Sequence, residues 1–513
     1  MSGLFKAHSG SWVERTRKTD SGWIGYPQNP TIHTPSILIH TSIVMQSGMR
    51  NSPTVRLLLT ALCLLCVCPV HAAEVPDLGQ RRTGTDWPAF LGPTGDGKSP
   101  EVGFFNDRGL LGTRILWQRP IGAGYAMPSV AHGRLFLFAR HDNVNRLECL
   151  SAETGEPLWK FEYPTRYEDT YGYSGGPRCC PVVDDDRVWI LGAEGMLHCL
   201  NVADGSIAWK LDTAEQFGVV KNFFGVGSTP IVEGDLLIAA IGGSPPESRD
   251  VPPGQFDRVR GNGSGVVAFD KRSGAVRYRF SDELASYSSP VMATIAGRRW
   301  GFVFARGGLV AFDPVAGTQD FHFPWRATIR ESANAANPVV VGDEVLVSET
   351  YGPGAALLKV RPGGSDVVWK DDVKQRQKNL QAHWSTPIHH EGFVYACSGR
   401  HVDNAELRCV EWKTGRVAWS ERGLSRTSLL FVDGHFFCLA ECGDLMVFLA
   451  NPEKFEQVGE IPLFDEGPAV DGERPRMLKY PAWAAPILSH GLLYVRGADR
   501  LVCIELARDE SMP

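Results

Sequence analysis

One short pattern recurs along most of the chain and constrains its fold more than any other feature. A complete copy has Pro followed by apolar residues, then Gly, an apolar stretch, Leu-x-Cys-Leu, Thr-Gly or Asp-Gly, and Trp. The clearest copy runs from Met127 to Trp159, and the next, from Cys180 to Trp209, keeps the same register. Repeated units that cannot bury their apolar faces alone predict an array in which neighbours cover each other.

Eight copies can be traced, although the later ones are degenerate. Their inner-strand segments begin near Pro128, Pro181, Pro230, Pro290, Pro338, Pro387, Ser428 and Pro486. A spacing of about 55 residues suits four short strands with their loops. The predicted fold class is therefore all-β, a β-propeller of about eight four-stranded blades. Seven blades is the alternative, which would hold if the degenerate copy at 428–445 only extended its neighbour.

The two ends of the repeat region complement each other. The last copy ends after Leu501-Val502-Cys503-Ile504 without the strand that carries Trp, whereas Ile115-Leu116-Trp117-Gln118 matches that strand and precedes the first copy. A ring of blades must cover the exposed edges of its first and last units. We therefore expect the N-terminal strand to pair with the last blade and close the ring.

The recurrent Trp is first of all a structural residue. Because it returns at one repeat position, we expect a large aromatic side chain wedged between adjacent blades. The blade-docking residues predicted in this way are Trp117, Trp159, Trp209, Trp369 and Trp419. Four cysteines also share one position, so we expect small core residues in separate blades and no disulfides between them. They are Cys149, Cys199, Cys409 and Cys503.

A single long apolar run, from Val55 to Val70, follows Arg50 and Arg56 and precedes Ala72. A basic segment, a short apolar core and a small-residue cleavage site are typical of a secretory signal peptide. We expect cleavage after Ala72. A short uncleaved membrane anchor is the alternative, although the run is short for a bilayer span.

Signal peptides begin at the start of translation, so Met45 or Met49 is expected to initiate the protein. The predicted organisation is a mis-assigned, disordered extension (1–48), a signal peptide (49–72), an N-terminal leader segment (73–114) and the propeller domain (115–513). The mature chain would then be exported, to the periplasm or the cell exterior, with no transmembrane segment beyond the signal peptide.

The charge balance excludes one class of partner. The chain has 52 basic and 58 acidic residues, a formal net charge of −6, and no long run of either sign. A nucleic-acid backbone needs a basic patch or stripe, so we expect no nucleic-acid binding. The 55 Gly and 34 Pro suit a fold made of strands and turns. We expect a monomer.

The repeat resembles that of the pyrroloquinoline-quinone (PQQ)-like repeat family, the quinoprotein alcohol dehydrogenase-like β-propellers, over residues 86–506. The leader Asp86-Trp87-Pro88-Ala89-Phe90-Leu91-Gly92-Pro93 resembles the opening of one exported bacterial subgroup, in which Arg is expected where Leu91 stands. The family contains PQQ-dependent alcohol dehydrogenases and, without a cofactor, a lipoprotein scaffold of the outer-membrane β-barrel assembly machinery. Fold alone therefore does not assign the function.

The resemblance to the dehydrogenases raises one redox hypothesis. Those enzymes hold PQQ with a calcium ion over the channel, and several stack the quinone against a disulfide between adjacent cysteines. Cys179 and Cys180 would form such a redox pair here. Their position directly before Pro181 also suits two small core-strand residues, because other copies carry Ser or Thr there.

Spacing alone cannot assign the oxygen ligands that calcium needs. Asn334 and Asn337 precede an inner strand and Asp169 lies in a neighbouring loop, but no metal site is predicted from them. No catalytic residue is assigned, and enzyme status stays open.

The loops that enter the inner strands are expected to surround one mouth of the central channel, a usual place for a ligand or partner. Their residues are unusually rich in aromatic and Arg side chains, which favour recognition. The predicted binding residues are Tyr125, Arg178, Tyr287, Asn334, His383, Trp384, Arg426 and Trp483. Arg178, Arg330 and Arg426 would suit an anionic partner. The alternative is that these side chains only plug the channel.

These observations favour a binding or protein-interaction scaffold in the cell envelope, without a cofactor. Its partner would be an envelope protein or a small-molecule ligand at the channel mouth. The alternative function is a PQQ- and calcium-dependent oxidoreductase of the alcohol dehydrogenase type. A hydrolase would need two carboxylates at a working separation, which the mouth residues do not supply.

Overall fold

The computed structural model describes residues 75–251, 255–329, 332–465 and 474–509. The chain divides into two units, residues 1–70 and 71–513, and the first lies outside the described residues. The extension predicted at 1–48, the signal peptide predicted at 49–72 and Arg330 likewise lie outside them, so those predictions stay untested. Within the described part, no helix is long and apolar enough to span a bilayer.

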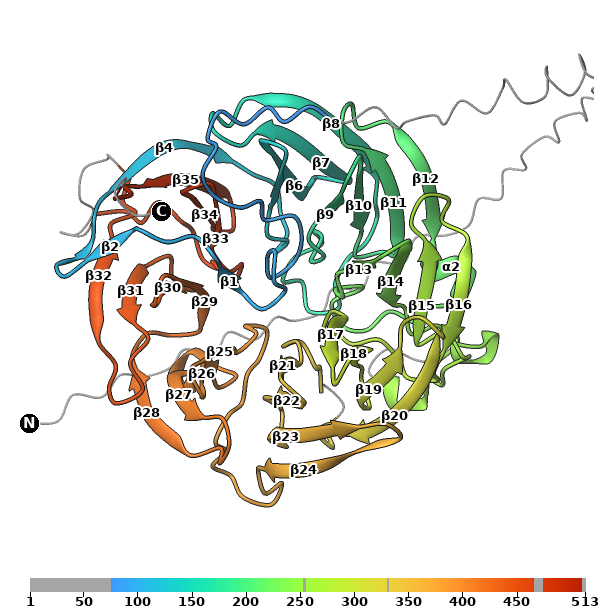
Figure 1. The fold of residues 1–513 in the computed structure, drawn as a ribbon. Helices are drawn as coiled ribbons and strands as arrows, with labels where there is room; N and C mark the ends of the chain where they lie inside the picture. Colours follow the sequence, from blue (N-terminus) through green and yellow to red (C-terminus); the bar gives the residue numbers. More distant parts are fainter. Residues whose placement is uncertain (1–74, 252–254, 330–331, 466–473, 510–513) are drawn as a thin grey trace, which may run out of the picture. The chain divides into compact units, whose positions relative to one another are not determined.

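The repeats form eight antiparallel sheets around one axis (Figure 1). In the first seven blades the four strands follow one another in chain order from the channel outward. The prediction of an eight-bladed propeller is confirmed. The degenerate seventh copy forms a complete blade, so the alternative of seven blades is wrong.

The first four blades have these strands: β5 (Ser129–Ala131), β6 (Arg134–His141), β7 (Val144–Ser151) and β8 (Pro157–Pro164); β9 (Val182–Asp184), β10 (Arg187–Leu191), β11 (Met196–Asn201) and β12 (Ile207–Asp212); β13 (Ile231–Glu233), β14 (Leu236–Ala240), β15 (Val266–Asp270) and β16 (Val276–Phe280); β17 (Val291–Ile295), β18 (Arg298–Phe304), β19 (Gly308–Asp313) and β20 (Thr318–Pro324).

The next three blades have β21 (Val339–Val341), β22 (Glu344–Glu349), β23 (Gly354–Arg361) and β24 (Gly364–Lys370); β25 (Ile388–His390), β26 (Phe393–Ser398), β27 (Glu406–Glu411) and β28 (Val417–Arg422); β29 (Thr427–Val432), β30 (His435–Ala440), β31 (Leu445–Leu449) and β32 (Gln457–Ile461). The helices are short: α2 (Thr213–Phe217), η1 (Pro246–Ser248), η2 (Phe256–Arg258) and η3 (Val402–Asn404).

The eighth blade joins the two ends of the repeat region. It consists of β33 (Ile487–Ser489), β34 (Leu492–Arg496), β35 (Arg500–Leu506) and the N-terminal β4 (Thr113–Pro120). Strand β4 pairs antiparallel with β35 and places Trp117 opposite Cys503. In Figure 1 the blue β4 lies beside the red β35. The predicted closure by the N-terminal strand is confirmed.

The outer strands show why Trp recurs. Trp159 lies opposite Cys149, a β-bulge follows at once, and the indole Nε1–H donates to the carbonyl of Val202 in the next blade at 3.0 Å. Likewise, the Nε1–H of Trp209 donates to the carbonyl of Lys271 in the third blade at 3.1 Å. A bulge after the same register position bends each outer strand and turns its aromatic side chain toward the neighbouring blade. Blade-to-blade contact is therefore built into the repeat.

The Trp position is not filled by Trp in every blade. Tyr278 occupies it in the third blade, where its hydroxyl donates to the carbonyl of Pro314 at 2.8 Å. Phe321 lies at this register in the fourth blade, and Gly459 in the seventh. The core between blades is continuous all the same: Phe302 of the fourth blade and Val347 of the fifth, for example, belong to one buried cluster.

The leader closes the end of the channel opposite the loops that enter the inner strands. Its Trp87 exchanges two backbone hydrogen bonds with Val130 of the first blade, and the carbonyl of Pro88 accepts from Val183 of the second, at 2.8 Å each. Strand β1 (Lys98–Ser99) then pairs in parallel with β29 of the seventh blade, and β2 (Phe105–Asn106) and β3 (Gly109–Leu110) form a hairpin.

Residues 88–97 therefore cross the channel. Pro88 contacts the second blade, and Gly97 lies against Ile388 of the sixth, which is on the opposite side of an eight-membered ring. The absence of a side chain at Gly97 matters, because a methyl group there would lie 3.0 Å from Ile388 Cδ1. The leader thus lies across the channel at the end opposite the loops that enter the inner strands.

Candidate functional site

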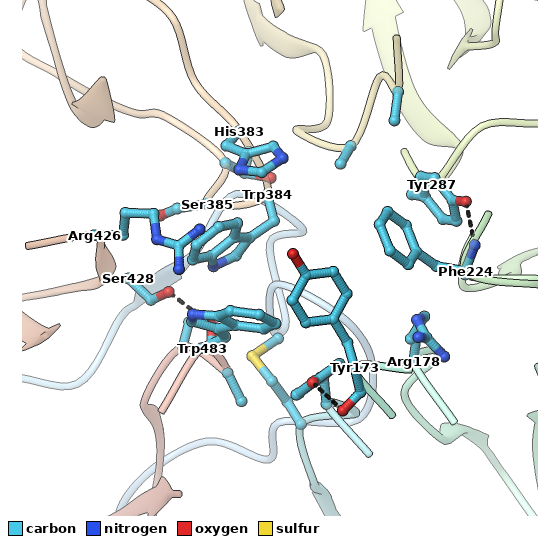
Figure 2. Close-up of a pocket in the computed structure, with 18 of the residues that line it drawn as sticks. Tyr173, Arg178, Phe224, Tyr287, His383, Trp384, Ser385, Arg426, Ser428 and Trp483 are labelled. Atoms are coloured by element: carbon cyan, nitrogen blue, oxygen red, sulfur yellow. Dashed lines mark hydrogen bonds between the residues drawn. The ribbon is translucent and has the colours of Figure 1, made fainter. Parts of the chain in front are cut away.

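The open mouth of the channel leads into a cavity of about 500 Å³ (Figure 2). All eight blades contribute to its lining, because every inner strand begins at this end of the ring. Of the residues predicted at the mouth, the following line the cavity: Tyr125, Arg178, Tyr287, His383, Trp384, Arg426 and Trp483. Two residues of the leader, Phe90 and Leu91, also line it. The volume is in the range of small-ligand sites.

Aromatic rings form the walls of the cavity. On one side, Trp483 lies 5.0 Å from Trp384 and 4.8 Å from Tyr125 between ring centroids. On the other side, Phe224 lies 5.6 Å from Tyr287. Figure 2 shows Tyr173 between these two groups, and its ring is 6.3 Å from Trp483 and 5.9 Å from Phe224. The aromatic contacts thus continue across the mouth.

A carboxylate behind the wall holds the first arginine. Arg426 donates from Nη2 to Glu441 Oε2 at 2.6 Å and from Nε to Oε1 at 2.9 Å, while Trp483 Nε1–H donates to the same carboxylate at 2.9 Å. Burial acts to raise the pKa of Glu441, but the hydrogen bonds from Arg426 and Trp483 outweigh it and hold the pKa below its usual value. This ion pair orients both rings that Arg426 covers, Trp384 at 4.8 Å and Trp483 at 5.2 Å.

A second buried carboxylate organises the loop across the mouth. Asp169 accepts from the backbone N–H groups of Tyr171, Tyr173 and Ser174 at 2.8 to 3.1 Å. It also accepts from Arg178 Nη2 at 3.1 Å. Arg178 in turn lies 5.7 Å from the ring of Tyr125. Asp169 therefore fixes the loop that carries Tyr171 and Tyr173, and it neutralises Arg178.

The third arginine of the lining has a different environment. The Arg400 guanidinium lies over the ring of Tyr351 at 4.5 Å, and within the described residues no carboxylate is paired with it. Tyr351 also lies 3.2 Å, through its hydroxyl, from His383 Nε2. Burial lowers the pKa of His383 to about 3, so this imidazole is neutral at physiological pH.

Asn334 does not line the cavity, which corrects its predicted place at the mouth. Its side chain is buried and donates from Nδ2 to the carbonyl of Ala305 at 2.7 Å. The backbone carbonyl of Asn334 accepts from the backbone N–H groups of Tyr287 and Ser288. The neighbouring Asn337 accepts from Ser289 N at 2.8 Å. The Asn334 amide thus reaches the end of the second strand of the fourth blade, and Asn337 reaches the start of its inner strand, so each satisfies a buried backbone group of the neighbouring blade.

The family model described as "Outer membrane protein assembly factor BamB" matches residues 107–245 and 251–447. The chain belongs to this family. The resemblance of the repeat to the PQQ-like propellers is thereby confirmed. No curated protein sequence matches the chain.

Two solved structures illustrate the likeness in fold. BamB from Moraxella catarrhalis is 12% identical, with 78% of this chain and 99% of that chain covered at a TM-score of 0.49. The quinohemoprotein alcohol dehydrogenase from Comamonas testosteroni is 13% identical, with 83% of this chain and 81% of that chain covered at a TM-score of 0.47. Similarity at this level assigns neither a binding nor a catalytic role.

The adjacent cysteines do not form a reactive pair in this structure. Both are free thiols and buried, and Cys180 lines the cavity. Burial raises the pKa of Cys180 to about 12 and that of Cys179 further above its ordinary value. Because the thiolate is the nucleophilic form, neither side chain is activated as a nucleophile.

The described residues do not fit a PQQ and calcium site. Calcium takes six or more oxygen ligands, among which carboxylates are prominent. None of the described residues that line the cavity is Asp or Glu, and the nearby Asp169 and Glu441 are held by arginines. The described part of the chain also has no cluster of three or more His, Cys, Asp or Glu able to hold a metal ion.

Several lining residues were missed by reasoning from the repeat. Tyr351 and Arg400 lie in loops that follow second strands, and Phe90 and Leu91 come from the leader. One signal was present for the leader: Leu91 stands where the resembling subgroup carries Arg. Its backbone is left-handed, with φ of 63°, which is uncommon for a bulky side chain and is often seen where structure serves a site.

Proposed function

We propose that this protein is a non-catalytic binding scaffold of the cell envelope that recognises a partner protein through the mouth of its channel. The observation that carries the proposal is the aromatic cavity, to which every blade contributes and which ion pairs hold in shape. Tyr, Trp and Arg are the residues that dominate binding energy in protein interfaces, because they combine large contact area with directional hydrogen bonds.

The titratable groups around the cavity support binding more than catalysis. A general acid or base works best with a pKa near the operating pH. His383 is neutral with a pKa of about 3, and the Cys180 thiol has a pKa of about 12. Burial raises the pKa of Glu349 to about 7, but this carboxyl lies behind the wall, where it accepts from Ser332 Oγ and from the backbone of Tyr351.

Two further observations support a place in the cell envelope. The family takes its description from an outer membrane protein assembly factor. The apolar run at 55–70 is typical of an export signal. An exported protein with a preformed recognition mouth suits a role in assembling or holding another envelope protein.

Site-specific photocrosslinking tests the proposal. A photoreactive residue at Tyr173, on the rim of the mouth, is expected to give a discrete protein adduct in the envelope of the native host. The same residue at Leu158, exposed on the outer strand β8, is the matched control and is expected to give none. Absence of any adduct from Tyr173, or equal adducts from both positions, would contradict the scaffold.

The competing function, a PQQ- and calcium-dependent oxidoreductase, rests on Cys180 in the cavity beside Cys179. It is separated by a second measurement. Residues 73–513 are incubated with PQQ and Ca²⁺, freed of excess ligand, and assayed for bound quinone by absorbance and for calcium. Stoichiometric retention of both, lost in the Cys180→Ala variant, would replace the scaffold with a dehydrogenase.

A further inference from the structure

We infer that the cavity receives an aromatic side chain from a partner protein segment that carries carboxylates next to that side chain. The inference rests on the proposed function and names the chemistry of the partner. It follows from the charges of the lining, from what covers the ring faces, from the polar groups available, and from the exposed rim.

The lining has an excess of positive charge. Arg178, Arg400 and Arg426 line the cavity, and none of the described lining residues is acidic. Asp169 neutralises Arg178, and Glu441 neutralises Arg426, whereas no described carboxylate is paired with Arg400. A partner carboxylate near Arg400 would therefore complete a charge pair without displacing an existing one.

The same arginines exclude a cationic occupant. Aromatic cages bind ammonium groups through the faces of their rings. Here Arg426 already covers Trp384 and Trp483, at 4.8 and 5.2 Å. Arg400 covers Tyr351 at 4.5 Å. A cation entering the cavity would meet like charges at the ring faces that would otherwise attract it.

The polar groups of the lining do not suit a sugar. Sugar hydroxyls need acceptors as well as donors, and carboxylate and amide side chains are the strong side-chain acceptors. The described lining has no Asp, Glu, Asn or Gln side chain. Its polar side chains are mainly guanidinium donors and the hydroxyls of Tyr, Ser and Thr. An aromatic group flanked by carboxylates matches this set better, because it supplies acceptors.

The rim shows that the occupant extends beyond the cavity. Four side chains that line the cavity are also among the exposed large apolar residues: Tyr171 at 51%, Tyr173 at 62%, Val402 at 48% and Tyr480 at 58%. An exposed apolar patch continuous with a cavity is typical of a protein interface, in which an anchor fills the cavity and flanking residues cover the rim. A small molecule inside the cavity would leave this rim in water.

Peptide binding to the purified mature chain tests the inference. The probe is a fluorescent peptide containing Asp-Glu-Trp-Asp-Glu with blocked ends. Its matched relatives carry Lys in place of each acid, or Ala in place of Trp. The acidic Trp peptide is expected to bind at least about tenfold more tightly than either relative, because truncating an interface anchor or juxtaposing like charges costs on the order of one or more powers of ten in affinity.

Variants locate the interaction. Arg400→Gln is expected to weaken binding of the acidic peptide about three- to tenfold and to flatten its salt dependence. Tyr173→Ala, at an exposed position that leaves folding intact, is expected to weaken it by a similar factor. The control, Arg279→Gln on the exposed outer strand β16, is expected to leave binding unchanged. An equal loss in the control would overturn the assignment to the mouth.

Other outcomes overturn the inference in distinct ways. Equal binding of the Lys peptide would remove the preference for carboxylates. N-acetyltryptophan binding as tightly as the peptide would assign the cavity to small aromatic acids and not to a protein segment. Failure of the acidic peptide to bind would reject this partner chemistry, while a specific adduct at Tyr173 would still support the scaffold. Absence of that adduct would instead reject the scaffold itself.

Discussion

Equivalent repeat positions carry similar side chains in the outer strands but different side chains at the channel mouth. At the outer-strand position one residue type returns, as in Trp159 and Trp209, and each donates to a carbonyl of the next blade. At the mouth, equivalent loops carry Tyr125, Arg178 and Trp483. The first position solves a similar packing problem in most blades, so Trp recurs there in five of the eight, with Tyr278 and Phe321 in two others and Gly459 in the seventh. The second surrounds a single cavity in which each blade contributes a different contact.

This difference means that the outer position should govern stability and the mouth should govern binding. An outer-strand variant that weakened binding without loss of stability, or a rim variant that unfolded the protein, would contradict this division.

Removal of a docking indole should have the largest effect. Trp159→Ala is expected to lower the free energy of unfolding by about 4 kcal/mol, because it removes a large aromatic side chain and the hydrogen bond to Val202. Denaturant unfolding measures the change. A loss below about 1 kcal/mol would show that the blades do not depend on this contact.

The Gly under the docking ring of Trp159 should be nearly as sensitive. Gly205 has φ of 72°, and a methyl group there would lie 2.5 Å from the ring of Trp159. Gly205→Ala is therefore expected to cost about 3 kcal/mol, from strain plus overpacking. Gly363 has φ of 78° with nothing within 4 Å, so Gly363→Ala should cost only about 1 kcal/mol. Equal losses of stability in Gly205→Ala and Gly363→Ala would show that contact with the Trp159 ring does not contribute to the cost.

The buried ion pair at the mouth should affect both properties. Glu441→Gln leaves the Arg426 guanidinium without its counter-ion and is expected to lower the unfolding free energy by about 2 kcal/mol and to weaken partner binding. The exposed pair of Glu411 and Arg416 is the matched control, and Glu411→Gln should change stability much less than Glu441→Gln, because solvent screens an exposed ion pair. Calorimetric unfolding compares the two.

A rim residue should affect binding alone. Tyr173 is 62% exposed, so Tyr173→Ala is expected to change the unfolding free energy by less than about 0.5 kcal/mol. Its photocrosslinked or peptide complex should nevertheless be lost or weakened. A stability loss comparable to that of Trp159→Ala would show that the mouth, like the outer strands, is mainly architectural.

The smallest effect should be a pH dependence of the leader. His490 Nε2 lies 3.0 Å from Asp86 Oδ1, and this hydrogen bond raises the pKa of His490. Burial acts to raise the pKa of Asp86, but hydrogen bonds from His490 and the backbone of His132 lower it overall. Glu101, which accepts from His490 N at 2.7 Å, adds a favourable charge.

The directions of these two pKa shifts define the pH range in which the pair of His490 and Asp86 stabilises the leader. The contribution of protonated His490 is fully present below its ordinary pKa and is lost as pH rises through the raised pKa; that of Asp86 is lost as pH falls through its lowered pKa. Leader amides such as Trp87 should therefore be less protected from hydrogen exchange at about pH 8.5 than at about pH 5.5, by less than about 1 kcal/mol after correction for intrinsic rates. His490→Gln should abolish the difference.

Much of the fold was predictable because each blade is specified by a local sequence pattern that recurs along the chain. A Pro before seven of the eight inner strands, recurrent turn Gly residues and the Trp of most outer strands mark the blades, and the separate Trp117 strand marks the closure. The candidate site was predictable in outline for the same reason. Loops at equivalent repeat positions must meet at one end of the channel, and all the predicted mouth residues except Asn334 line its cavity.

The remaining features depend on contacts between residues far apart in the chain. No local pattern could pair Arg426 with Glu441, leave Arg400 beside Tyr351, or show that Asn334 turns into the ring instead of the cavity. The leader had no repeat to place it, so its passage across the channel was not foreseen.

The sequence by itself determined the architecture of this protein: an all-β ring of eight blades closed by its own N-terminal strand. The repeat pattern is local and periodic, so each copy by itself predicts a four-stranded blade that packs against its neighbours. Only the tertiary structure decided which arginine of the mouth lacks a carboxylate partner among the described residues and at which end of the channel the leader lies. Those properties arise where all eight blades and the leader converge, and convergence is set by three-dimensional geometry and not by spacing along the chain.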